Sequence, residues 1–174
     1  MPRNMQAWAG ELVGTYGFVT IGAGAGIVAG SGLADLGLFG VAVANGVALA
    51  VMVTAFFAIS GGHFNPAITL SALVGRRIRG VDALGYVACQ VIGALFAGLT
   101  LRIIFEETSW RPAGLGAPGL TISPGRGVLV EAIFTLEKST SETRGLDRYS
   151  PHYPTSRFAA FAAVGPESAR GDRG

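Results

Sequence analysis

Three long stretches of this chain carry almost no charged residues, and this feature limits the possible folds more than any other. From residue 8 to 30 the only charged residue is Glu11, and there is none from 36 to 60 or from 83 to 101. A helix that crosses a bilayer needs about 20 predominantly apolar residues. The sequence therefore predicts an all-α membrane protein with spanning helices over about 8–30, 36–60 and 81–102.

Charge is distributed unevenly between the two parts of the chain. Residues 1–136 contain 7 Arg and 6 acidic residues, whereas the 38 residues of 137–174 contain 6 Lys and Arg and 5 acidic residues. Only 14% of the whole chain is charged, against about 25% in soluble domains, which argues against a soluble enzyme. We predict a transmembrane region over 1–136, followed by a tail, 137–174, whose composition is typical of disorder.

A fourth apolar stretch, 127–136, is only about half as long as a membrane crossing. It ends abruptly at Glu137 and Lys138, where the composition changes. We interpret 127–136 as a partial span and hypothesise that the tail continues a longer gene out of frame. Reading the other frames of the coding DNA downstream of Leu136 tests this hypothesis.

Several other classes of protein are disfavoured by composition. A net charge of +2 gives no basic field for nucleic acid binding. Two histidines and one cysteine, Cys89, offer no cluster with metal-ligand spacing. The spans contain no nucleophile–base pair and no paired carboxylates. We therefore expect no enzyme, no metal and no cofactor.

Arginines indicate how the helices are oriented. Arg3 precedes the first span, and Arg76, Arg77 and Arg79 follow the second. Loops rich in arginine and lysine stay in the cytoplasm. We expect a multi-pass protein of the cell membrane with a cytoplasmic N-terminus, although arginines in the segment 102–126 weaken the asymmetry.

The segment between the second and third spans has strong local signals. It reads Ser60-Gly61-Gly62-His63-Phe64-Asn65-Pro66-Ala67-Ile68-Thr69-Leu70. Gly61 and Gly62 interrupt the helix, Asn65 is a good N-cap, and Pro66 suits the first helical position. The pattern predicts a half-helix over 65–75 that enters the membrane without crossing it, with its positive N-terminal end near the bilayer midplane. Non-helical backbone at that depth must be buried or line a water-filled cavity.

This run resembles the aquaporin and glycerol facilitator family, also called major intrinsic proteins, whose hallmark is an Asn-Pro-Ala half-helix in such a loop. The resemblance covers about 8–136 and implies an aquaporin-like helix bundle, of which this chain carries the first inverted repeat, truncated. It also implies a pore lined by the Asn-Pro-Ala residues and by the carbonyls before them: Asn65, Pro66, Ala67, Gly61, Gly62 and His63.

The resemblance also gives roles to two intramembrane glutamates. In the family, a Glu in the first helix braces a pore loop, and Glu131 lies where the fourth helix carries the counterpart of Glu11. Glu11 and Thr15 recur as Glu131 and Thr135, an offset of 131 − 11 = 120 residues, as expected for an inverted repeat. For each glutamate, a helix-end residue near the interface is the alternative. A second half-helix would begin near 65 + 120 = 185, beyond residue 174.

Asn45 lies twenty positions before Asn65, where the family carries a constriction residue that is commonly aromatic. Two interpretations compete evenly for Asn45: a pore-lining polar residue, or a polar residue that faces a neighbouring helix.

The resemblance implies a passive channel for water or small neutral solutes such as glycerol, acting in the lipid bilayer. A homotetramer is implied by the resemblance alone. The alternative is a truncated, non-conducting membrane fragment or interaction protein, because a single half-repeat leaves Asn65 without a matching half-helix.

Overall fold

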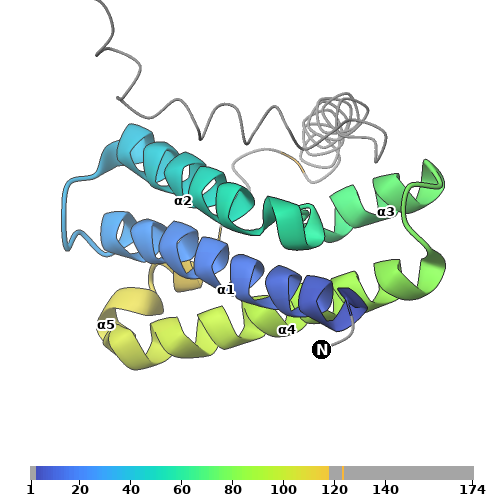
Figure 1. Cartoon of the computed structure of the whole chain (residues 1–174). Coiled ribbons are helices and arrows are strands. Elements are labelled where there is room, and N and C mark those ends of the chain that lie inside the picture. Colours follow the sequence, from blue (N-terminus) through green and yellow to red (C-terminus); the bar gives the residue numbers. More distant parts are fainter. Residues whose placement is uncertain (1–2, 118–122, 124–174) are drawn as a thin grey trace, which may run out of the picture. The chain divides into compact units, whose positions relative to one another are not determined.

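The computed structural model describes residues 3–117 and residue 123, within the first of two units, 1–136 and 137–174. This part of the chain is helical and contains no strand (Figure 1). The elements are α1 (Arg3–Gly30), α2 (Gly37–Ser60), α3 (Pro66–Val74), α4 (Gly80–Ile104), α5 (Glu107–Trp110) and the short 3₁₀ helix η1 (Gly114–Gly116).

Three of these helices are long and apolar enough to cross a membrane: Asn4–Gly30 in α1, Gly37–Ser60 in α2 and Gly80–Ile104 in α4. The predicted all-α membrane fold, with three spanning helices, is therefore confirmed. Many large apolar side chains lie on the outside of the helices. Leu38 is 87% exposed and Ile103 is 85% exposed, as expected for surfaces that face lipid. The predicted partial span 127–136 and the tail 137–174 lie outside the described residues.

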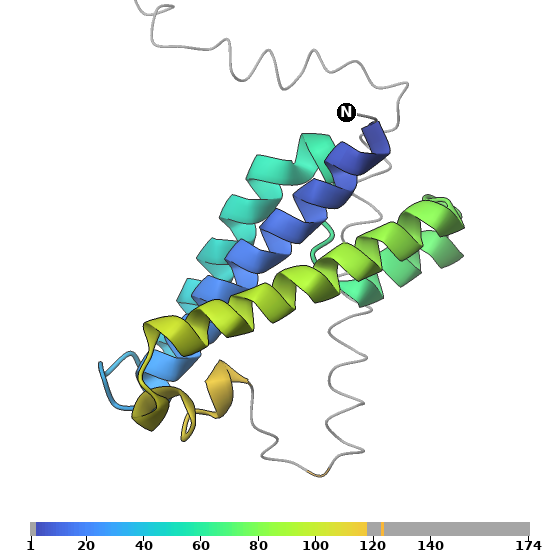
Figure 2. The same cartoon turned by 90° about the horizontal axis from the view of Figure 1, so that it is seen from below.

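α1 is the central helix of the described unit. It packs against both α2 and α4, and the short helix α3 packs against α4. Figure 1 shows α1 between α2 and α4, and Figure 2 shows α3 alongside the first part of α4. This arrangement holds the segment between α2 and α3 close to α1 and α4.

Small residues permit the close approach of α1 and α4. A Cβ atom placed on Gly93 of α4 would lie 2.5 Å from the backbone oxygen of Leu12 in α1 and 3.2 Å from the backbone nitrogen of Tyr16. These neighbours are backbone atoms and cannot rotate away. In lipid, where the hydrophobic effect does not bring helices together, such contacts between small residues carry much of the packing energy.

We predict that Gly93→Ala separates α1 from α4. The added methyl group meets backbone atoms, so the free energy of unfolding should fall by about 1 to 3 kcal/mol, the usual range for overpacking. Thermal unfolding in detergent measures the change. Gly98→Ala, on the same helix, is the matched control, because its Cβ would meet only a side-chain methyl of Leu115 at 3.5 Å. Equal stability of the two variants would contradict the prediction.

Candidate functional site

The chain leaves α2 through two glycines in the left-handed region. Gly61 has φ 87° and caps α2 by donating its N–H to the carbonyl oxygen of Phe57 at 2.9 Å. Gly62 has φ 67°, and a Cβ there would lie 3.3 Å from the Cα of Val53. Glycine meets both demands because it has no Cβ. Phe64 follows with φ 45°, a conformation that a bulky residue adopts only when its surroundings hold it there.

The carboxylate of Glu11 holds this segment. The Glu11 side chain is 0% exposed. Its Oε1 accepts hydrogen bonds from the Ser60 hydroxyl at 2.6 Å and from the backbone N–H of His63 at 3.0 Å. Its Oε2 accepts from the backbone N–H of Phe64 at 2.7 Å and from the Gln90 amide at 2.7 Å. One carboxylate thus joins α1, the end of α2, the following segment and α4.

Gln90 extends the network to the half-helix. Its Nε2 donates one hydrogen to Glu11 and the other to the Thr69 hydroxyl, at 3.0 Å. Thr69 donates its own hydrogen to the carbonyl oxygen of Asn65 at 3.2 Å. Its contact with His63 Nδ1, at 3.1 Å, therefore requires His63 to donate, because a hydroxyl has one hydrogen. This network places a hydrogen on Nδ1 of the His63 ring.

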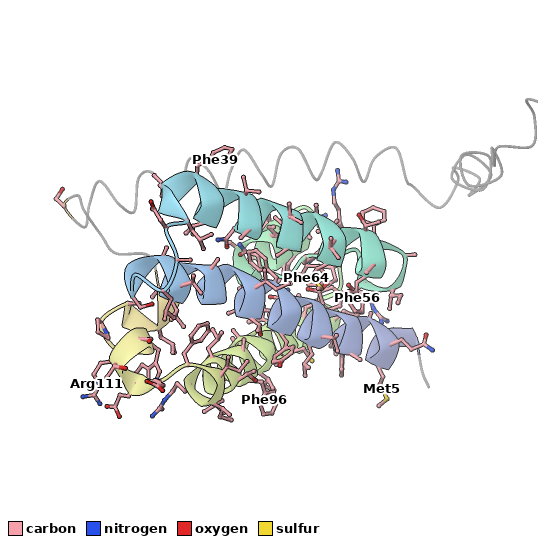
Figure 3. All side chains as sticks on the ribbon, turned by 90° about the vertical axis from the view of Figure 1, so that its left-hand side faces the viewer. Met5, Phe39, Phe56, Phe64, Phe96 and Arg111 are labelled. Carbon is pink, nitrogen blue, oxygen red and sulfur yellow. The ribbon has the colours of Figure 1, made fainter. Side chains whose placement is uncertain are left out.

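Aromatic rings fix the same segment from its other sides. The Phe64 ring lies against α1 at Gly14, where a Cβ would overlap the ring. Phe64 also meets Phe56 of α2 edge to face, with centroids 6.1 Å apart (Figure 3). The His63 ring meets Tyr86 of α4 in the same way, at 5.2 Å. The rings of His63 and Phe64 are therefore packed against the neighbouring helices.

The half-helix α3 begins where the local signals place it. Asn65 is extended, with φ −152°, and its Oδ1 accepts a hydrogen bond from the Ala67 N–H at 2.8 Å. Pro66 occupies the first helical position. The Asn65 oxygen is thus engaged in capping, and its Nδ2 amide remains the part of the side chain that can donate elsewhere.

The backbone N–H groups and the carbonyl oxygens of residues 61–64 differ in their hydrogen bonding. The N–H groups of Gly61, Gly62, His63 and Phe64 donate to Phe57, Ser60 and Glu11. Within the described part of the chain, no donor bonds the carbonyl oxygens of Gly61, Gly62 or His63. The segment therefore binds the protein through its N–H groups and leaves three acceptors in a row.

Sequence reasoning missed four side chains that build this site: Ser60, Thr69, Tyr86 and Gln90. Besides the bonds above, the Tyr86 hydroxyl donates to the carbonyl oxygen of Ser60 at 2.7 Å. A signal for Gln90 was present, because a strongly polar side chain inside an uncharged span is expected to face the bundle interior. Its partners are 79 and 21 residues away along the chain, so spacing alone gives no hint of them.

Asn45 packs between two helices. Its Nδ2 donates to the carbonyl oxygen of Val41 in its own helix at 2.9 Å. Its Oδ1 lies against Gly22 of α1, in the space that a Cβ atom on that glycine would fill. These contacts are those of a polar residue facing a neighbouring helix, and its pore-lining role stays a prediction. Glu131 lies outside the described residues. Among the described residues, no three His, Cys, Asp or Glu could hold a metal ion.

Three spanning helices and a half-helix that begins at a buried polar segment define the class of this protein. It is a multi-pass α-helical membrane protein in which a half-helix follows the second spanning helix.

Comparison with known sequences identifies the family. The profile described as "Major intrinsic protein" matches residues 1–140, and the chain belongs to this family. It is 35% identical over 132 residues to "Glycerol uptake facilitator protein-like 6" of Lactiplantibacillus plantarum, covering 75% of this chain and 59% of that protein. It is 38% identical over 142 residues to "Aquaporin TIP4-3" of Zea mays, covering 77% and 54%. It is 35% identical over 127 residues to "Lens fiber major intrinsic protein" of Gallus gallus, covering 73% and 48%. The chain thus spans about half the length of these curated relatives.

We predict that Glu11→Gln disrupts the segment. A Gln side chain keeps one acceptor oxygen but turns an NH₂ group toward two of the four donors now bonded to the carboxylate. Each unsatisfied buried donor costs about 1 to 3 kcal/mol, so we expect a loss of about 3 kcal/mol in the free energy of unfolding. Thermal unfolding in detergent measures it.

Asp35→Asn is the matched control, because it makes the same chemical change at an exposed residue between α1 and α2. A loss no larger in Glu11→Gln than in Asp35→Asn would show that the carboxylate does not hold the segment.

Proposed function

We propose that this protein acts as a passive channel for water or small neutral solutes such as glycerol. The proposal rests on the difference in hydrogen bonding between the backbone N–H groups and the carbonyl oxygens of residues 61–64. Their N–H groups bond to the protein, while the carbonyls of Gly61, Gly62 and His63 have no partner among the described residues. Backbone of this kind is tolerated in a membrane where it lines a water-filled path.

The three carbonyls and the start of α3 act on a permeating molecule in complementary ways. The carbonyls accept hydrogen bonds from hydroxyl hydrogens, and the Asn65 amide donates to a hydroxyl oxygen. The N-terminal end of α3 carries a partial positive charge, which opposes cations at the same point. Pro66 and Ala67 form the first turn beside this path. Neutral molecules with hydroxyl groups are the solutes that such a site serves.

Several further properties belong to this proposal. Glu11 braces the pore segment, and Glu131 would do so for the second repeat of the family. We infer a location in the cell membrane with a cytoplasmic N-terminus, supported by the arginines at residues 76, 77 and 79. A homotetramer is supported by family membership and by the exposed apolar faces of α2 and α4.

Osmotic shrinkage tests the function. We expect proteoliposomes that contain the 174-residue chain to shrink faster in stopped-flow light scattering than empty vesicles of the same lipid. Vesicles that carry the same density of an unrelated membrane protein control for leakage. Shrinkage no faster than that of empty vesicles would reject conduction and favour the alternative, a non-conducting membrane protein. A glycerol gradient then distinguishes the two solutes.

We predict that Asn65→Asp separates transport from folding. Aspartate caps a helix as well as asparagine, so α3 should form and thermal stability should change little. The carboxylate replaces the Nδ2 donor and adds a negative charge. Loss of one hydrogen bond of about 1 kcal/mol to the permeating molecule corresponds to an about fivefold fall in water permeability.

Asn4→Asp, at an exposed position in the first turn of α1, is the matched control and should leave permeability unchanged. An Asn65→Asp channel that conducts water as well as the original chain would remove Asn65 from the path.

A further inference from the structure

The turn between α3 and α4 is the most basic part of the described surface. Arg76, Arg77 and Arg79 are all exposed. The neighbouring acid, Asp82, accepts a hydrogen bond from Arg79 Nε at 2.7 Å through its Oδ2. Three arginines against one aspartate leave an excess of 3 − 1 = +2 here. The four remaining N–H donors of the Arg79 guanidinium lie on its two Nη atoms, outside that bond.

The opposite ends of the spanning helices have no such excess. The described acids there are Asp35, Glu106 and Glu107, and the arginines are Arg102 and Arg111, which gives 2 − 3 = −1. Arg111 is bonded to Glu107 at 2.6 Å, and the guanidinium of Arg102 lies 4.9 Å from the centre of the Trp110 ring. Among the described residues, positive charge is therefore concentrated at the α3–α4 turn.

Arg76 has a backbone conformation that favours glycine. Its φ is 55°, in the left-handed region that disfavours residues with a Cβ. The hydrogen bonds of the turn are those of a Schellman motif, with Arg77 N–H to the Ala72 oxygen at 2.8 Å and Arg76 N–H to the Leu73 oxygen at 3.0 Å. The left-handed position of this motif is usually glycine. Here Gly75 stands one residue earlier, and an arginine occupies the strained position.

The end of α3 does not need the Arg76 side chain. In its last turn the carbonyls of Ser71, Ala72 and Leu73 accept hydrogen bonds from the backbone N–H groups of residues 75–77. No described residue forms a hydrogen bond or ion pair with the Arg76 guanidinium. The stability of the turn therefore does not explain an arginine at this position. Binding of a ligand from outside the protein would explain it.

Apolar side chains lie beside the arginines. Val74 is 85% exposed at the end of α3. Val81 and Leu84, each 72% exposed, are three residues apart in the first turns of α4 and so lie on one face of that helix. Arginines at the start of a spanning helix, with exposed aliphatic side chains beside them, fit a molecule that has an anionic head and a hydrocarbon tail.

We propose that the α3–α4 turn binds an anionic phospholipid of the surrounding bilayer. Arg76 and Arg79 hold the phosphate of the headgroup, and an acyl chain lies along Val81 and Leu84. Arginine suits phosphate because its planar guanidinium donates two parallel hydrogen bonds. The inference goes beyond solute transport and holds whether or not the chain conducts.

Lipid-dependent thermal stability tests the proposal on the full 174-residue chain in uncharged detergent. Phosphatidylglycerol is the probe, and phosphatidylcholine is its neutral counterpart. A lipid that binds the folded state raises Tm as its concentration increases. We expect phosphatidylglycerol to raise Tm well above the effect of phosphatidylcholine, and the midpoint of the titration gives the apparent affinity.

Arg76→Gly is the decisive variant. Glycine suits the left-handed position, so Tm without lipid should stay the same or rise. Near a membrane surface each arginine strengthens binding to anionic lipid about fivefold, so we expect about fivefold weaker binding in Arg76→Gly and about 25-fold in Arg76→Gly with Arg79→Gln. Arg111→Gln, at the opposite end, is the control and should bind as the original chain does.

Four outcomes would overturn the proposal. Equal effects of the two lipids would show that charge is not recognised. Unchanged affinity in Arg76→Gly would remove the turn from the site. Equal weakening by Arg111→Gln would indicate attraction spread over the whole surface. An equal shift with soluble glycerol phosphate, which has no acyl chains, would identify a free phosphate rather than a lipid as the ligand.

Discussion

The structure depends on one carboxylate buried inside a membrane helix bundle. An ionised group in such a place is costly unless donors surround it. Glu11 meets this condition with a donor from the end of α2, two from the following segment and one from α4. The same bonds that stabilise the carboxylate determine the path of the chain between α2 and α3. The hydrogen bonds that the buried Glu11 side chain requires thus determine the geometry of the site.

The path of this segment decides which backbone groups remain available. The N–H groups of His63 and Phe64 bond to Glu11, while the carbonyls of Gly61, Gly62 and His63 have no donor among the described residues. The positive φ values at Gly61 and Gly62 permit this path of the chain. Thr69 then ties the first turn of α3 to Gln90 and to the Asn65 oxygen. The half-helix and its preceding carbonyls are therefore positioned by a single polar network.

Local signals in the sequence were sufficient for the elements but not for the network. The three spans follow from uncharged length, and the start of α3 follows from Asn65 and Pro66, because capping is decided within a few residues. The bond between Gln90 and Glu11 joins residues 79 apart, and it exists only because α1 and α4 approach closely. For Asn45 the sequence left two roles open, since a half-buried amide has no local signature that distinguishes a pore from a helix interface.

Glycine placement explains why a chain with so little buried apolar surface still packs. Lipid solvates exposed leucine or valine as well as a helix neighbour does, so apolar side chains give these helices little reason to associate. Gly14 admits the Phe64 ring, and Gly93 admits the backbone of α1, so that the polar groups of Glu11 and Gln90 come within bonding distance. Gly46, by contrast, has nothing within 4 Å of where its Cβ would be. Close approach and the buried hydrogen bonds therefore stabilise each other, whereas the lipid-facing surface is free to vary so long as it stays apolar.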